Sequence, residues 1–341
     1  MGEVVVLSLD NLNYDPPSMK GRVGGVTMKK KLAGSLVVVL FMLLAVYSQA
    51  VYAVEFPGVV VSTDFVAKHL KTIRNPAQTD IRLVEVSKKG YAKGHIPGAV
   101  HIKWGSEVFN PLSDHMILTY DEVKEVMKKL GVTKKTDIII YASKIDQATR
   151  FYWTLKFWKV NNLHIMNGTK SKWIKEGREK TRAVPSVSKL NYNVSYPPNT
   201  KIRAQLTPDV FYALSTGKSI FIDCRPAAYY TGKKYSVKKW VRSGHIPGAK
   251  NVACPEETNN RDGSFKSKAE LKAIFAKVGV TGNKPVIAYC NTGVRSSLGW
   301  FVLSEILGYK HISNYDGSMR EYANRLDLPI VPPNIYPKFP K

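Results

Sequence analysis

The stretch Gly94-His95-Ile96-Pro97-Gly98-Ala99 recurs, residue for residue, as Gly244-His245-Ile246-Pro247-Gly248-Ala249. Two shorter matches follow in the same order. Gly-Val-Thr at 131–133 returns at 279–281, and Asn-Gly at 167–168 is matched by Asp-Gly at 316–317. A nearly constant offset of about 150 residues indicates two copies of one globular domain, because solenoid repeats are far shorter.

Each copy contains the same alternation of helix and strand signals. An N-capping residue precedes a helical segment, a short apolar run follows, and a capping box opens the next helix. In the first copy these signals fall at 62–70, at 81–86 and at Thr119 with Glu122, before a strand at 137–141; in the second they fall at 207–214, at 219–223 and at Ser267 with Glu270, before a strand at 285–289. The pattern predicts an α/β fold: two tandem domains, each a parallel sheet with helices on both faces.

The chain therefore divides into four expected parts. Residues 1–53 form an N-terminal extension with a signal peptide, 57–180 the first domain, 181–200 a linker, and 201–341 the second domain with a C-terminal tail. The linker is assigned because it carries three prolines among several Ser and Asn residues and has no helical or strand periodicity.

The N-terminal part has the layout of a secretory signal. Three lysines at 29–31 precede an apolar run at 32–46 and small residues at 48–53, which predicts cleavage after Ala53 and an exported, periplasmic or otherwise extracytoplasmic protein. An uncleaved membrane anchor is the alternative, although the run is shorter than the roughly 20 residues of a spanning helix. Residues 1–27 are a poor start for such a signal, so we expect translation to begin at Met28.

Composition limits the classes of partner. The formal net charge of +25 attracts anions, but the basic residues are scattered and no motif for reading bases is present, so we expect no nucleic-acid partner. Three cysteines make no disulfide framework. The seven histidines show no metal-ligand spacing, so we expect no metal and no cofactor. The basic stretch at 233–239 is predicted to be a solvated loop.

Chemistry is predicted in the loop Cys290-Asn291-Thr292-Gly293-Val294-Arg295. It joins the strand at 285–289 to a helix at 296–307, and functional loops leave the carboxyl ends of parallel strands. Loop N–H groups, the helix dipole and the charge of Arg295 all favour a thiolate at Cys290. Glycine at 293 lets the backbone curl without a Cβ clash. The alternative is a buried structural cysteine.

These motifs together resemble the rhodanese superfamily, specifically its tandem-domain sulfurtransferases; the resemblance rests on the repeated Gly-His-Ile-Pro-Gly-Ala, Asp223-Cys224-Arg225, the Cys290 loop and Tyr315-Asp316-Gly317-Ser318. It implies that Cys290 takes a sulfane sulfur from a small anionic donor such as thiosulfate or mercaptopyruvate and passes it to a thiol or cyanide. Residues 291–295 and Arg225 would bind the donor, with Arg225 alternatively bracing the loop through Asp223. We expect a monomer that meets a membrane only through its signal peptide or an uncleaved anchor.

The two copies differ at these positions. Ala142 stands where the second copy has Cys290, Ser87 where it has Arg225, and Glu85 where it has Asp223. The resemblance implies the same division of labour, with an inactive first domain packed on a catalytic second one. The neutral Asn291 and Thr292 depart from the animal thiosulfate enzymes of the family, which carry two basic residues there. The Arg295 ending departs from the animal mercaptopyruvate enzymes, whose loop ends in Thr, so the donor is not assigned by analogy.

Other functions stay open on the sequence alone. The chain could be a sulfur or selenium carrier that does not turn over, or a redox-sensing binding protein. Cysteine phosphatases place five residues between Cys and Arg, whereas four intervene here, which favours a sulfane donor. His95 and His245 are interpreted as structural, Cys224 as a core residue, and Cys254 as a resolving thiol only if it lies within disulfide reach of Cys290.

Overall fold

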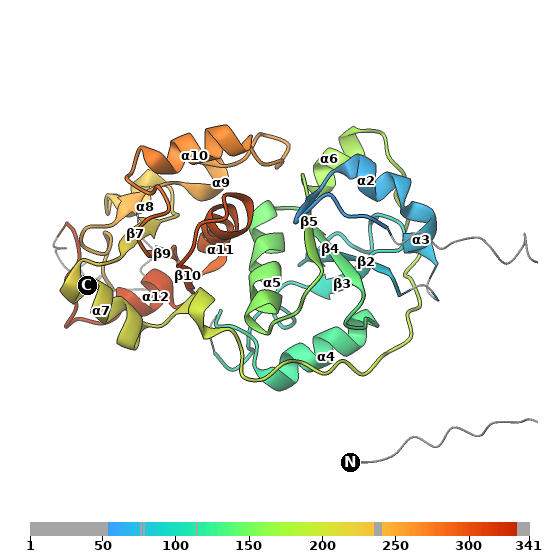
Figure 1. Cartoon of the computed structure of the whole chain (residues 1–341), viewed down its shortest axis with the longest axis horizontal. Coiled ribbons are helices and arrows are strands. Elements are labelled where there is room, and N and C mark those ends of the chain that lie inside the picture. The colour runs from blue at the N-terminus through green and yellow to red at the C-terminus, as the bar shows by residue number, and fades with distance from the viewer. Residues whose placement is uncertain (1–53, 76, 78, 114, 235–240, 333–341) are drawn as a thin grey trace, which may run out of the picture. The chain divides into compact units, whose positions relative to one another are not determined.

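The structure, a computed structural model, describes residues 54–75, 77, 79–113, 115–234 and 241–332 (Figure 1). The chain divides into Met1–Glu55 and Phe56–Lys341, and the second of these units contains both copies of the repeat. The predicted extension and signal peptide lie outside the described residues, as do most of the basic stretch at 233–239 and the end of the C-terminal tail. Within the described part of the chain, no helix is both long enough and apolar enough to span a membrane.

Each copy folds around a five-stranded, fully parallel sheet. The strand order is β1-β5-β4-β2-β3 in the first domain and β6-β10-β9-β7-β8 in the second, so corresponding strands occupy corresponding places. The strands of the first sheet are β1 Val60–Val61, β2 Ile81–Ser87, β3 Val100–Lys103, β4 Asp137–Ala142 and β5 Leu163–Met166; those of the second are β6 Arg203–Ala204, β7 Ile220–Asp223, β8 Lys250–Asn251, β9 Val286–Tyr289 and β10 Ile312–Tyr315.

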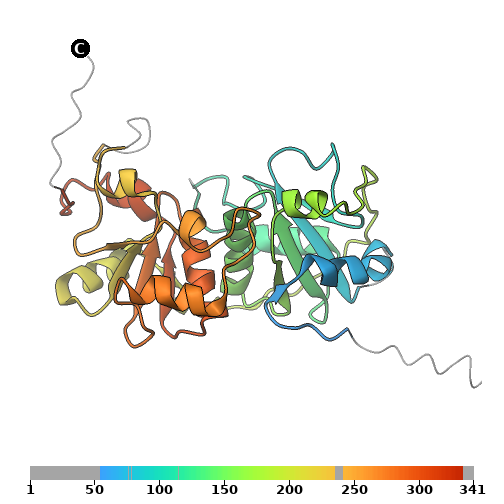
Figure 2. The same ribbon diagram turned by 90° about the horizontal axis from the view of Figure 1, so that it is seen from above.

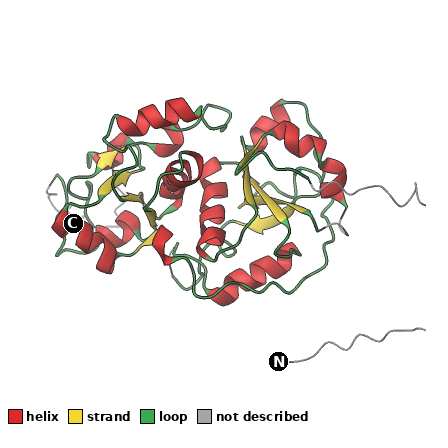
Figure 3. Ribbon diagram, viewed as in Figure 1, coloured by secondary structure: helices red, strands yellow, loops and turns green. Residues whose placement is uncertain are grey.

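Helices connect the strands, as the alternation predicts (Figure 3). Both predicted capping boxes are present, Thr119 with Glu122 and Ser267 with Glu270. The first domain has α2 Thr63–Lys68, α3 Leu70–Arg74, α4 Tyr120–Leu130, α5 Ile145–Phe157 and α6 Lys170–Lys175; the second has η1 Thr200–Ile202, η2 Leu206–Val210, α7 Phe211–Thr216, α8 Ala227–Tyr230, α9 Cys254–Glu257, α10 Lys268–Ala276, α11 Val294–Phe301, η3 Val302–Ile306 and α12 Ser318–Tyr322. The predicted fold class is confirmed.

Strand β9 shows why both faces of the second sheet are covered. Successive side chains of a strand point to opposite faces. Ile287 and Tyr289 belong to the apolar cluster that includes α7 and α12, whereas Val286, Ala288 and Cys290 belong to the cluster that includes α10 and α11. All five of these side chains are buried, so the strand is apolar throughout instead of alternating with polar residues.

The two domains meet through α5 and α11, which lie side by side in both views (Figures 1 and 2). Thr149 and Ser297 occupy equivalent positions in the two copies, and their hydroxyl oxygens lie 3.2 Å apart in a shared hydrogen bond. Tyr152 packs edge-on against Phe301, with ring centroids 4.9 Å apart. One apolar cluster runs through both domains. Each helix is therefore buried both against its own sheet and against the other domain.

The segment between α6 and η1 forms no helix and no strand of two or more residues, yet it is anchored. Tyr192 and Val194 are buried in the shared apolar cluster. Thr181 and His95 exchange backbone hydrogen bonds, with both N···O distances 2.9 Å. This segment is thus held against the first domain along its length.

Candidate active site

The Cys290 loop lies at the carboxyl end of β9, in the middle of the second sheet. Cys290 is 1% exposed. Three residues later Gly293 takes a left-handed conformation with φ 74°, and α11 begins at Val294. A Cβ at position 293 would lie 2.5 Å from Arg150 Nη1 and 2.6 Å from the Asp316 Cα. Both the turn and the lack of space therefore require glycine here.

Ser318 fixes the curl of the loop. Its Oγ accepts hydrogen bonds from the backbone N–H groups of Cys290 and Gly293, at 3.0 and 3.1 Å, and donates to the Tyr315 carbonyl at 2.6 Å. The Ser296 hydroxyl lies 3.5 Å from the Cys290 sulfur and donates to it. The N–H of Gly293, expected to face the donor, is therefore already engaged by Ser318.

The loop opens onto a cavity of about 190 Å³ that receives residues from both domains. From the second domain it is lined by Cys290, Asn291, Thr292, Val294 and Arg295, and from the first by Trp104, His115 and Asp146. Within the described residues, the buried Oδ1 of Asn291 has no hydrogen-bond partner. The cavity thus joins a sulfur nucleophile, a cation and an unsatisfied amide oxygen.

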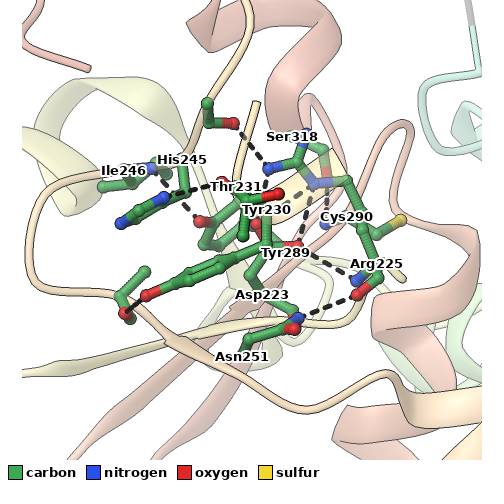
Figure 4. Close-up of polar contacts among 12 residues, drawn as sticks. Asp223, Arg225, Tyr230, Thr231, His245, Ile246, Asn251, Tyr289, Cys290 and Ser318 are labelled. Atoms are coloured by element: carbon green, nitrogen blue, oxygen red, sulfur yellow. Dashed lines mark hydrogen bonds and ion pairs between the residues drawn. The ribbon is translucent and has the colours of Figure 1, made fainter. Parts of the chain in front are cut away.

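Arg225 occupies a different place from the other predicted donor-binding residues. It is 1% exposed and does not line the cavity. Its Nε and Nη2 donate to the Asp223 carboxylate at 2.9 and 2.5 Å, and Nη2 also donates to the Gly244 carbonyl at 2.7 Å (Figure 4). The structure therefore places Arg225 in an ion pair with Asp223, outside the residues that line the cavity; which of its two roles it plays stays a prediction. Burial alone would lower its pKa, but the negative charge of Asp223 raises the pKa overall.

The first domain has an equivalent set of polar contacts, but without the arginine. The Tyr289 hydroxyl accepts from the N–H of Ile246, and the equivalent Tyr141 hydroxyl accepts from the N–H of Ile96. Tyr141 then donates to Glu85 at 2.7 Å. The charge opposite Glu85 comes from the Lys170 ammonium at 2.9 Å. A lysine from α6 thus compensates for Ser87, so the domain stays folded without the groups used for chemistry.

The repeated histidines lie away from the cavity. His95 stacks on Tyr91 and His245 on Tyr230, each with ring centroids 3.8 Å apart. The Nδ1 atoms lie 3.0 and 2.8 Å from the carbonyl oxygens of the same two tyrosines. Each imidazole therefore connects its Gly-His-Ile-Pro-Gly-Ala motif to the segment that contains the tyrosine.

Arg150, on α5 of the first domain, holds the loop from across the interface. It is fully buried, and its Nη1 donates to the Gly293 carbonyl at 3.2 Å. Its Nη2 donates to the His115 carbonyl at 2.9 Å and lies 3.9 Å from the Asp316 carboxylate. Asp316 in turn accepts from Arg203 at 3.0 Å and from the N–H of Ile117 at 3.1 Å. Parts of both domains thus converge on one buried carboxylate.

This cluster also shapes the electrostatics around the nucleophile. Burial lowers the pKa of Arg150 to about 10, and the negative charges of Asp316 and Cys290 act to raise it. Cys290 also acts to raise the pKa of Arg225. Two buried guanidinium groups, those of Arg150 and Arg225, thus lie within electrostatic reach of Cys290.

The other two cysteines form a buried pair. Cys224 and Cys254 are both 0% exposed and hydrogen-bonded to each other, and burial is the main cause that raises both pKa values. A Cβ on Gly299 would meet their sulfurs at 2.7 and 2.9 Å. The thiol in contact with Cys254 is therefore that of Cys224, and α11 packs over both. Neutral buried thiols of this kind are poor nucleophiles.

Sequence reasoning missed the residues that reach the site from the first domain. These residues, Arg150, Asp146, His115 and Trp104, belong to no repeated motif, so no local pattern marks them. Ser318 did carry a signal, because it ends the Tyr315–Ser318 match to the family. Among the described residues, no group of three or more His, Cys, Asp or Glu side chains could hold a metal ion.

The fold and site define a class: two tandem parallel-sheet α/β domains with one nucleophilic cysteine loop at a sheet's carboxyl edge. The family model of the Rhodanese-like domain matches two segments of the sequence, residues 66–176 and 207–325. The chain belongs to this family, with two copies of its domain.

Named relatives cover most of the chain. It is 36% identical over 285 residues to the "Sulfur carrier protein TtuD" of Thermus thermophilus, covering 81% of this chain and 97% of that protein. It is 32% identical over 279 residues to a "Putative thiosulfate sulfurtransferase" of Haloferax volcanii, covering 80% and 96%. The solved structure of the 3-mercaptopyruvate sulfotransferase SseA from Escherichia coli matches with a TM-score of 0.65 and 26% identity, over 76% of this chain and 98% of that one. These relatives support sulfur transfer as the general activity.

The crowding at Gly293 gives a testable difference between two glycines. Gly293 and Gly308 share φ 74°, but a Cβ at Gly308 would meet nothing within 4 Å. We expect Gly308→Ala to cost about 1 kcal/mol of unfolding free energy, for backbone strain alone. Gly293→Ala should cost at least about 2 kcal/mol, because Arg150 or Asp316 must also move.

Chemical denaturation of both variants measures this difference, and alkylation of Cys290 reports the shape of the loop. Gly308→Ala should keep the wild-type alkylation rate. Equal losses of stability, with unchanged alkylation in both variants, would show that the loop tolerates a side chain at position 293.

Proposed function

We propose that this chain is a sulfurtransferase that moves a sulfane sulfur from thiosulfate or a related donor to a thiophilic acceptor through a persulfide on Cys290. The observation that carries the proposal is the placement of Cys290 and Arg295 on one small cavity, with Ser296 donating to the sulfur. A thiolate is the competent nucleophile, and a guanidinium is well suited to bind an oxyanion.

The residues suit each half of the reaction. The Cys290 thiolate attacks the outer sulfur of thiosulfate, a sulfur–sulfur bond forms as another breaks, and sulfite leaves with the electron pair of the broken bond. Arg295 would balance the charge on the departing oxyanion. The acceptor, cyanide or a thiolate, then attacks the outer persulfur atom and regenerates the Cys290 thiolate. Arg150 would hold the loop in place during both halves of the reaction, through its hydrogen bond to the Gly293 carbonyl.

A sulfur carrier is the second candidate. It is favoured by the Thermus thermophilus relative, which is named a sulfur carrier protein. A carrier would form the same persulfide but deliver it to one protein partner, without repeated turnover on small acceptors. The two functions use the same cysteine and differ in the acceptor.

Export is the part of the proposal that concerns the N-terminus. It rests on the basic, apolar and small-residue layout of residues 29–53. N-terminal sequencing of the protein from extracytoplasmic fractions tests it, since cleavage after Ala53 leaves Val54 as the first residue.

The second prediction concerns the nucleophile. Incubation with thiosulfate should add one sulfur atom to Cys290 and none to Cys224 or Cys254, which are buried as neutral thiols. Cys290→Ser should abolish the addition and leave the fold intact, because Ser is a near-isostere and a far poorer nucleophile. Intact-protein and peptide mass spectrometry measure this.

Adding cyanide together with excess thiosulfate then separates the candidates. Many turnovers per chain support the enzyme, and a single discharge supports the carrier. Full sulfur addition to Cys290→Ser would refute the site.

The third prediction concerns Arg295. Arg295→Ala should lower the second-order rate constant for loading with thiosulfate, because it removes about 2–4 kcal/mol of transition-state stabilisation. Arg295→Lys should recover only part of this, because an ammonium does not reproduce the guanidinium fork.

The matched control is Lys310→Ala, which removes the same charge from an exposed position. Lys310 lies just before β10, at the amino end of the strands, whereas the Cys290 loop lies at their carboxyl end. Single-turnover loading is the measurement. If Arg295→Ala and Lys310→Ala slow loading equally, the effect is one of net charge and Arg295 binds no donor.

A further inference from the structure

The cavity beside Cys290 also receives a carboxyl group from the first domain. Asp146, in the first turn of α5, lines the same cavity as Cys290 and Arg295. The domain that lacks the cysteine thus places an acidic group where an anionic sulfur donor would enter. A cavity built only to attract anions would have no use for this residue.

Neither charged group is neutralised by direct pairing. Among the described residues, the side chains of Asp146 and Arg295 form no ion pair with each other or with any other group within 4.0 Å. They do act on each other through space, because the charge of Arg295 acts to lower the pKa of Asp146. A ligand in the cavity therefore meets one positive and one negative group, both free to interact with it.

Packing between the domains fixes Asp146 in this place. The Thr149 hydroxyl, which meets Ser297 of α11, also donates to the Asp146 carbonyl at 3.3 Å. The first turn of α5 is thus tied to the first turn of α11, next to the Cys290 loop. Asp146 is half-buried, so its charge is only partly screened by water.

We propose that Asp146 determines which donors the site accepts, by disfavouring ligands that bring more negative charge than Arg295 can neutralise. The proposal rests on the proposed function and deepens it. A monoanion places its charge on Arg295. A dianion such as thiosulfate leaves a second charge facing Asp146 in a cavity of about 190 Å³. Asp146 is a specificity residue and takes no part in bond making.

The effect depends on pH in a defined direction. Burial raises the pKa of Asp146, opposed by Arg295 on α11, by Lys144 and by the Gln147 N–H, and assisted by Glu256 on α9. Above that pKa the carboxylate is charged and repels anions. As pH falls through it, the repulsion disappears.

The test compares wild type with Asp146→Asn by two independent readouts. The first is alkylation of Cys290 by iodoacetate, an anion, relative to neutral iodoacetamide. Asp146→Asn should raise this ratio roughly 3- to 10-fold, as expected for removing one nearby charge from a partly screened site. The second is single-turnover loading, in which thiosulfate should gain more than mercaptopyruvate.

Measuring the alkylation rates over a range of pH separates the effect of Asp146 from that of other titrating groups. The variant-to-wild-type ratio of iodoacetate rates should be largest at neutral and higher pH, and should approach one as pH falls and Asp146 is protonated. Taking the ratio at each pH cancels the ionisation of Cys290 itself, provided both proteins share it; the iodoacetamide profiles of the two proteins check this.

The matched control is Glu256→Gln, which removes an equal charge from an exposed residue that does not line the cavity. Its alkylation ratio should stay close to wild type. An Asp146→Asn ratio equal to wild type, or equal to that of Glu256→Gln, overturns the proposal. Because alkylation needs no sulfur donor, this result is distinguishable from failure of the proposed function, in which neither donor loads wild-type Cys290.

Discussion

The site depends on one guanidinium that crosses between domains. Arg150 leaves α5 of the first domain, donates to the Gly293 carbonyl of the catalytic loop, and shares the buried Asp316 with Arg203. Both Arg150 and Asp316 are withdrawn from water. Removing one partner of such a buried pair commonly costs about 3–5 kcal/mol, because the other is left uncompensated. The same buried ion pair therefore fixes both the shape of the loop and the association of the two domains.

This constraint accounts for the asymmetry between the copies. Once the first domain supplies a clamp and one wall of the cavity, its own loop no longer needs a nucleophile. Its polar frame persists in altered form, with Glu85 and Lys170 in place of Asp223 and Arg225. The first domain has Ala142 in place of the loop cysteine, yet it contributes Arg150 and Asp146 to the site of its neighbour.

The fold was predictable because its signals are local. The repeated motif, the capping boxes and the apolar strands each report on a few consecutive residues, and the two copies confirm one another. Cys290, Gly293 and Arg295 were also predictable, because one loop carries them in order. Arg225 shows the limit: the sequence placed it near Asp223, but its burial and its bond to Gly244 are visible only in the structure. Arg150 and Asp146 come together with Cys290 only through packing between domains, which no local pattern records.

The claim that Arg150 positions the catalytic loop is tested most directly by single-turnover loading of Cys290 in Arg150→Lys, compared with Arg203→Lys. Both variants keep the charge near Asp316, but lysine at 150 cannot reach Gly293, His115 and Asp316 at once. Arg150→Lys should load roughly tenfold more slowly or worse, because a misplaced loop loses its reactive geometry. Arg203→Lys should stay near the wild-type rate. Wild-type loading in a folded Arg150→Lys protein, or equal slowing in both variants, would contradict the account.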